Sequence, residues 1–417
     1  MKKIVIFGSG ASIPFFNPPL TTDFLTSKIK DRNLWEDLVS RFNNLMRGTN
    51  VIDLNIIIAA IERIDTINNK SNFEQIIEII DKVSSYCFDP ITNSKAFHNI
   101  LRFFNVRNKQ MFCSHSWNIT PFLFRQLIAE SILNLQNKCK DEKYHHLTTL
   151  QANFFEYIMT KGNISLFSFN YDDVLHDSLR TLDFEHGFKN GRFDSLRYFT
   201  ADNTISFPHG HLRFTIDDNG IKYYEDSIQA NTDRFDKLAV YDSNETRYIV
   251  ESNYCYNFNT FLVTGNAKES TFDNNPYAAY YQKLAADILG GNEITIVGYS
   301  FGDSHINRLL LNFLELNVNN RIFVIDKASN PVNMIPDFMN QNSIINKIFS
   351  WLDKKPLPLS NVYTYKYQKN VDEINKNGYG MLSPQIYIYK NGYENFLTDF
   401  VNIFQVLHSV EKSLVKA

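Results

Sequence analysis

The sequence KIVIF at Lys3–Phe7, followed directly by GSGAS at Gly8–Ser12, predicts how this chain folds. A short run of β-branched and aromatic side chains that ends at a glycine turn is typical of a buried parallel strand. Three later runs repeat the pattern, at Ile164–Phe169, Ile294–Val297 and Arg321–Asp326. Stretches with helical spacing separate these runs, so we expect an α/β fold with a Rossmann-like, doubly wound parallel sheet.

Most of the predicted helices lie between the first two strands. Apolar residues have helical spacing at Thr21–Arg47, Asp53–Ile67, Phe73–Ser85, Pro121–Asn137 and Tyr144–Thr160. Asn72 is the expected N-cap of the third helix, with Glu74 in its first turn. The helices at about residues 50–160 interrupt the first and second strands, so we expect them to form a helical insertion.

The later part of the chain is more varied. Residues 183–250 indicate loops and small β elements, at Ile205–Phe207, Ile221–Tyr224 and Tyr248–Val250. Helices are expected at Pro276–Leu289, at Ser304–Leu316 and, near the end, at Tyr393–Lys416. We expect residues 331–417 to form a mixed α/β C-terminal extension that can pack on the same domain.

The composition excludes several classes of protein. With 417 residues, 44% hydrophobic and 21% charged, the chain is expected to fold around a large core. The apolar stretch after Met1 ends at Gly8, too early for a signal peptide or a membrane span, so we expect a cytoplasmic protein that binds no membrane. The 42 basic and 45 acidic residues nearly balance, which gives no electrostatic reason to expect direct binding of nucleic acid.

The four cysteines are widely spaced. They are Cys87, Cys113, Cys139 and Cys255, and no two form a C-x-x-C pair. We therefore expect buried thiols in a reducing compartment, and neither a disulfide framework nor a zinc site.

The first candidate motif is the turn at Gly8–Ser12. Its small residues would let backbone N–H groups approach a pyrophosphate at a helix start. It is not G-x-G-x-x-G, because Ile13 replaces the last glycine, and no Gly-Lys-Ser/Thr follows as in a P-loop. A tight turn between strand and helix explains the same residues without a ligand.

Two further motifs could supply catalytic groups. In SFNYDD at Ser168–Asp173, an amide and a carboxylate at a strand end can hold a ribose and a water, although Asn170 or Asp172 could simply cap the next helix. In PHGHL at Pro208–Leu212, His209 is a candidate general base because the histidine pKa lies near neutrality. His209 and His211 could instead be metal ligands, or they could be structural.

The last motif is GYSFGDSHIN at Gly298–Asn307, after the third strand. Ser300 could hydrogen-bond a phosphate there, whereas Asp303 could cap the following helix. Asp326 ends the fourth strand, where an acidic residue commonly binds ribose hydroxyls or an adenine edge.

Together these motifs resemble the sirtuin superfamily, and in particular the bacterial sirtuin-like proteins of antiphage defence that consume NAD+. GSGAS resembles the family's G-A-G-x-S turn, FNYDD its T-Q-N-x-D strand end and PHGHL its His-Gly. GYSFGDSHIN is similar to the form G-Y-S-F-x-D-x-H-I of the defence branch, and Asn72-Phe73-Glu74 also looks like a stretch of that branch. The resemblance covers about residues 1–330 in pieces, and it implies an NAD-binding catalytic domain at residues 1–330 that contains the helical insertion.

The resemblance implies that Asn170 and His209 are the catalytic pair that cleaves the bond between nicotinamide and ribose. Residues that would bind NAD+ by the same comparison are Gly8, Ser9, Gly10, Ala11, Ser12, Tyr171, Asp172, Gly298, Tyr299, Ser300, Asp303 and Asp326. Protein-deacylating sirtuins carry a four-cysteine zinc module after the His-Gly, but only Cys255 follows His209 here. The S-G-I-P-x-F-R run of the deacylases is also replaced, so water is the expected acceptor.

These features predict an NAD+ glycohydrolase that releases nicotinamide and ADP-ribose as a toxic effector of antiphage, abortive-infection defence. The resemblance also implies a homo-oligomer and a partner such as a HerA-type ATPase or an Argonaute-like protein. A protein deacylase or ADP-ribosyltransferase is the first alternative, and a module that senses NAD+ or ADP-ribose without turnover is the second.

Overall fold

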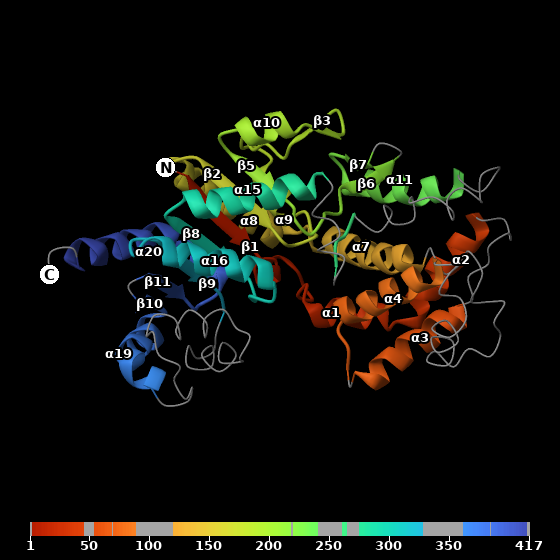
Figure 1. Ribbon diagram of the computed structural model, residues 1–417, viewed down its shortest axis with the longest axis horizontal. Coiled ribbons are helices and arrows are strands. Elements are labelled where there is room, and N and C mark those ends of the chain that lie inside the picture. The colour runs from red at the N-terminus through yellow and green to blue at the C-terminus, as the bar shows by residue number, and fades with distance from the viewer. Residues whose placement is uncertain are drawn as a thin grey trace.

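A seven-stranded sheet forms the centre of the protein in the computed structural model (Figure 1). Its strand order is β10-β11-β9-β8-β1-β2-β5. The strands are β1 (Lys3–Phe7), β2 (Ile164–Ser168), β5 (Thr204–Ser206), β8 (Glu293–Val297), β9 (Arg321–Ile325), β10 (Tyr379–Ser383) and β11 (Ile386–Tyr389). All neighbours pair in parallel except β10 and β11, which are antiparallel. The predicted α/β class with a mostly parallel, Rossmann-like sheet is confirmed.

The structure describes residues 2–45, 54–68, 70–88, 120–217, 220–240, 261–264, 275–327, 362–383 and 385–414. The short strand expected at Tyr248–Val250 lies outside these ranges, as do Cys113 and Cys255. In the described part of the chain, no helix is both long and apolar enough to cross a membrane.

Strand β1 lies in the interior of the sheet because both of its faces are covered. Ile4 and Ile6 belong to a core cluster with α15 (Tyr277–Gly290) and α16 (Ser304–Leu316). Val5 and Phe7 belong to the other core cluster, with α8 (Glu142–Met159) and α20 (Tyr393–Leu414). Burial on both faces is the reason that the strand is a continuous apolar run rather than an alternating one.

The helical insertion packs beside the carboxyl ends of the strands (Figure 1). It contains α2 (Arg32–Leu45), α3 (Leu54–Ile67), α4 (Phe73–Phe88) and α7 (Thr120–Cys139), with α1 (Thr22–Ile29) before them. The single helix expected over Thr21–Arg47 is wrong, because α1 ends at Ile29. The Trp35 indole donates to the Ile29 carbonyl at 2.7 Å, which stabilises the bend between α1 and α2.

The C-terminal segment extends the same sheet. β11 pairs with β9 in the register Ile386↔Ile322 and Tyr389↔Ile325, and α19 (Val362–Asn377) precedes β10. Six further short elements follow β2 among the described residues: α9 (Val174–Leu179), β3 (Phe188–Lys189), β4 (Arg192–Phe193), α10 (Ser195–Thr200), β6 (Phe214–Asp217) and β7 (Gly220–Tyr223). The longer helix α11 (Ser227–Val240) comes after β7.

Candidate functional site

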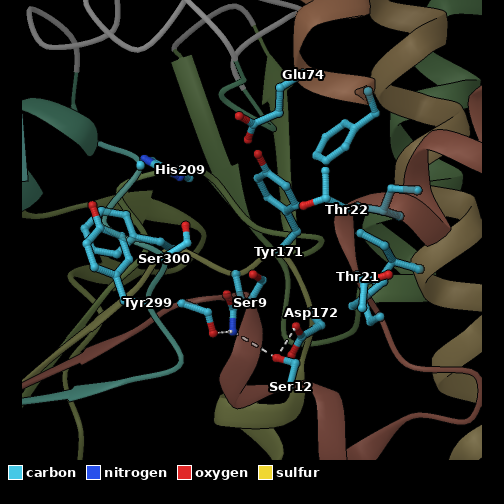
Figure 2. A pocket seen from close by; sticks show the side chains of 18 of the residues that line it. Ser9, Ser12, Thr21, Thr22, Glu74, Tyr171, Asp172, His209, Tyr299 and Ser300 are labelled. Atoms are coloured by element: carbon cyan, nitrogen blue, oxygen red, sulfur yellow. Dashed lines mark hydrogen bonds between the residues drawn. The ribbon is translucent and has the colours of Figure 1, made fainter. Parts of the chain in front are cut away.

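A cavity of about 320 Å³ lies at the carboxyl ends of β1, β2 and β8 (Figure 2). Open parallel sheets bind their ligands at this edge. Residues named from the sequence that line it are Gly8, Ser9, Ser12, Asn170, Tyr171, Asp172, His209, Tyr299, Ser300 and Asp303. The four candidate motifs therefore meet in one place.

Four of the named residues do not line this cavity: Gly10, Ala11, Gly298 and Asp326. Gly298 has a φ of +56°, and a Cβ there would lie 2.2 Å from the Ala11 nitrogen. The Gly10 amide donates to the Gly298 carbonyl at 2.9 Å. These residues hold the first turn against the turn after β8.

Asp326 lies beside the C-terminal strand β11 instead. Its backbone amide donates to the Tyr389 carbonyl, and its Oδ1 accepts from the Lys327 amide at 2.7 Å. The sequence could not show that β11 would join the sheet next to β9. Strand β8 lies between β9 and β1, so Asp326 is one strand further from the cavity than the turn after β8.

The GSGAS turn differs from the phosphate-binding turn that we expected. The amides of Gly8, Gly10, Ala11 and Ser12 already donate to the backbone carbonyls of Val297, Gly298, Gly8 and Ser9, respectively. Two 3-10 turns follow, Ser9–Ala11 and Ile13–Phe15, and the first α-helix begins only at Thr22. Ser9, which is exposed and lines the cavity, is the residue of this turn best placed to contact a ligand.

Asn170 is fixed in orientation by two contacts. Its Nδ2 donates to the Gly8 carbonyl and to the Ser12 hydroxyl, both at 2.9 Å. A backbone carbonyl can only accept, so the nitrogen of the amide must face Gly8. The buried Oδ1 accepts no hydrogen bond from any residue in the described ranges. Asn170 therefore carries an acceptor that a ligand hydroxyl or a water could use.

Asp172 continues this network (Figure 2). Its Oδ2 accepts from the Ser12 hydroxyl at 2.7 Å, and its Oδ1 accepts from the Val174 amide at 3.1 Å at the start of α9. The alternative of a helix cap is thus partly right for Asp172 and wrong for Asn170. Burial raises the pKa of Asp172 to about 6, against the opposing effect of the Ser12 hydroxyl.

His209 lies across the cavity from this network (Figure 2). Its Nε2 is 3.3 Å from Asp303 Oδ2, and its ring packs edge-on against Phe169 with centroids 4.7 Å apart. Asp303 also caps α16, since its Oδ1 accepts from the amides of His305 and Ile306. The cap role expected for Asp303 is confirmed, and the same carboxylate orients His209.

Gly210 allows the backbone to present His209. Its φ is +84°, and a Cβ at this position would lie 2.2 Å from the Phe261 carbonyl oxygen. The neighbouring residues pair with this segment, since the His211 amide donates to Phe261 and the Val263 amide donates to His209.

His211 has a structural role. Its Nε2 lies 3.0 Å from the Asp172 carbonyl oxygen, and burial lowers its pKa to about 3, so the ring is neutral and donates there. The Leu212 amide donates to the Tyr171 carbonyl, which joins the same two loops. His211 is thus committed to the backbone, and no group of three metal-ligating side chains occurs within the described ranges.

The prediction of buried thiols can be compared with the structure at Cys139. Cys139 is buried and unpaired, and its Sγ accepts from the Asn17 amide at 3.3 Å. It packs in the hydrophobic core at the end of α7. This thiol agrees with the expected buried, reduced cysteine.

Two helices add residues that were not assigned to the site from sequence: Thr21 and Thr22 at the start of α1, and Glu74 in α4. The Glu74 side chain points toward the Tyr171 hydroxyl, with Thr22 on the same side (Figure 2). The predicted cap at Asn72 is confirmed, because its Oδ1 accepts from the Gln75 amide at 2.9 Å and the Gln75 side chain accepts in return. The sequence thus placed Glu74 in the first turn of a helix, but no sequence signal showed that this helix lies beside the cavity.

The sequence matches no protein-family model and none of the curated proteins with which it was compared. The resemblance to sirtuins therefore rests on the sequence motifs alone.

Proposed function

We propose that this chain is an NAD+ glycohydrolase that releases nicotinamide and ADP-ribose. The observation that carries the proposal is the pairing of Asn170 and His209 across one cavity, each held by a different neighbour. Asn170 has an unused acceptor, and His209 is oriented by a carboxylate. Such a pair can place a ribose and activate a water.

In the proposed reaction, the bond between ribose C1′ and the nicotinamide nitrogen breaks, and its electron pair leaves with nicotinamide. Water then bonds to C1′ and transfers a proton to His209, which releases it to solvent. Asn170 Oδ1 would accept from a ribose hydroxyl or from this water. The carboxylate of Glu74, which forms no salt bridge with any described residue, would stabilise the positive charge that develops on the ribose.

The test measures NAD+ loss and product formation by mass spectrometry for the purified chain. We expect Asn170→Ala and His209→Ala to lose nicotinamide release while their thermal unfolding stays cooperative. Asn319→Ala and His146→Ala are matched controls, because both side chains are exposed and neither lines the cavity. Full activity of both site variants at saturating NAD+ would show that the site is misassigned.

The alternatives give different products. A deacylase or ADP-ribosyltransferase would form nicotinamide only with an acyl-lysine or protein acceptor, and a sensor would bind NAD+ or ADP-ribose without releasing nicotinamide. By resemblance, we also propose that the protein acts as a cytoplasmic antiphage effector and homo-oligomer with a HerA-type ATPase or Argonaute-like partner. Assays of NAD+ cleavage with and without the products of neighbouring genes test the proposed role in defence. An effector that is inactive alone should release nicotinamide when its partner is added, whereas a sensor should not.

A further inference from the structure

The segment at residues 261–264 pairs with the backbone at His209. All four of its residues are fully buried, and Leu262 forms an antiparallel bridge with Gly210. The Val263 amide donates to the His209 carbonyl at 2.8 Å. The place of the His209 backbone therefore depends on what holds this segment.

Arg125 of α7 holds the segment from the side of the helical insertion. Its Nε donates to the Leu262 carbonyl at 2.9 Å. Its Nη1 and Nη2 donate to the two carboxylate oxygens of Asp81 on α4, at 2.8 Å and 2.7 Å, and Nη1 also donates to the Pro121 carbonyl at 3.1 Å. The Arg125 side chain is fully buried, so these charge-assisted hydrogen bonds form away from bulk water, where they are strongest.

The contacts of Arg125 reach the candidate site only through the backbone. Arg125, Asp81 and Leu262 do not line the cavity. A planar guanidinium can serve a carboxylate and a carbonyl in fixed directions at the same time, which a lysine ammonium cannot do. This geometry suits a residue that orients His209 and does not touch the ligand.

The partner of Arg125 lies on the same helix as Glu74. Glu74 and Asp81 are seven residues apart in α4, so they lie about two turns apart on one face of this helix. Glu74 lines the cavity, whereas Asp81 binds Arg125. One helix thus carries part of the cavity wall and, two turns later, the anchor of the segment that pairs with His209.

We propose that Arg125 is a positioning residue for His209, which it holds through the Leu262 carbonyl and the segment at 261–264. The predicted effect on rate rests on the proposed NAD+ cleavage, whereas the restraint on the His209 backbone is a property of the fold. Loss of the guanidinium contact frees the segment, so the His209 ring leaves the geometry in which it faces Asp303. A small displacement of a catalytic group can remove much of the rate while substrate binding is kept.

Hydrogen exchange of the full chain, followed by mass spectrometry, tests the restraint without any need for activity. In Arg125→Lys, peptides that contain the His211 and Val263 amides should exchange about tenfold or more faster, the equivalent of one lost charge-assisted hydrogen bond. Peptides from β2 should be unchanged. Arg41→Lys is the matched control, because Arg41 forms a similar pair with Glu130 of α7 away from the cavity lining.

Kinetics test the consequence for NAD+ cleavage. Arg125→Lys should lower kcat by about tenfold or more and change KM by less than about twofold, because the substrate contacts remain. Asp81→Asn, at a half-buried position, removes the charge of the pair but leaves the donor to Leu262 in place. It should change exchange and kcat in the same direction by a smaller factor.

The outcomes separate this proposal from the proposed function. Unchanged exchange at His211 and Val263 in the folded variants would overturn the positioning role, as would faster exchange throughout the chain or faster local exchange with unchanged kcat. If the unmodified chain cleaves no NAD+, with or without the products of neighbouring genes, the proposed function fails and exchange alone decides the positioning. Thermal unfolding shows whether each variant is folded, and Asp81→Asn decides the matter if Arg125→Lys is not.

Discussion

Ser12 is the residue that joins the two polar groups at the base of the candidate site. Its hydroxyl accepts from Asn170 and donates to Asp172. The hydrogen bond to the carboxylate lowers the pKa of Asp172, while burial raises it to about 6. The Ser12 hydroxyl therefore opposes the effect of burial on the protonation of Asp172.

Replacement of Ser12 by alanine should shift the pH dependence of NAD+ cleavage. Without the hydroxyl, the carboxylate loses a stabilising partner, so the pKa of Asp172 rises further, by about one unit. The acidic limb of the plot of kcat/KM against pH should shift to higher pH by a similar amount. Ser27→Ala, on the exposed surface of α1, should leave the limb in place. An unmoved limb in Ser12→Ala would mean that Asp172 does not control activity.

Glu74→Gln tests the electrostatic role proposed for the insertion. The substitution keeps the shape of the side chain and removes its charge, so kcat for NAD+ cleavage should fall by about tenfold or more with a smaller change in KM. Glu78→Gln, one turn later on α4 and salt-bridged to Lys82, should change neither constant. Equal constants for Glu74→Gln and the unmodified protein would contradict the role.

Buried histidines should make the protein sensitive to acid. Burial lowers the pKa values of His176 and His211 to about 4 and about 3. The unfolded chain therefore binds more protons below pH 6.5, so the free energy of unfolding falls as pH falls. Asp172 acts in the opposite direction, because its raised pKa adds stability as pH falls from about 6 to about 4.

The effect of the two histidines on the free energy of unfolding should exceed that of Asp172. At about 1.4 kcal/mol per pKa unit, the two histidines remove roughly 4 kcal/mol between pH 6.5 and pH 5, and Asp172 returns about 1 kcal/mol. Urea unfolding at pH 7, 6 and 5 should show a steady fall in the midpoint, and a midpoint that rises toward pH 5 would contradict this accounting.

At the scale of elements, the close approach of two turns holds the cavity together. The Gly8–Ser12 turn packs on Gly298, which allows no side chain. Gly298→Ala should lower the free energy of unfolding by about 2 kcal/mol or more, because it combines a left-handed backbone with a steric overlap. Gly290→Ala is the matched control, since a Cβ there meets no atom within 4 Å. Similar urea midpoints for the two variants would contradict this account of the turn.

Elements with strong local signals could be predicted closely from the sequence. The bounds of β1 and α16 agree with the apolar run at Lys3–Phe7 and with the capped helix at Ser304–Leu316. The bend after Ile29 and the strand β11 could not be predicted in this way. Both depend on distant partners, the Trp35 indole and the edge of β9.

The residues of the candidate site also divide into those with a local sequence signal and those placed by distant contacts. Residues at strand ends, such as Asn170 and His209, could be found because topology brings such ends together. Glu74 could not be assigned to the cavity, because the position of α4 depends on packing against α7 and α1. The same limit applies to Gly10 and Gly298, because the sequence could not show that the two turns pack against each other outside the cavity lining.

At the scale of the whole molecule, the cavity joins residues from Gly8 to Asp303, and β1 pairs with strands about 160 and 290 residues later in the chain. During translation, β1 is synthesised before β2 and β8, the two strands that pair with it. The cavity cannot form until β8 and the cap of α16 have been synthesised. If the protein destroys NAD+, a chain that terminates before β8 lacks part of the cavity and cannot carry out the cleavage.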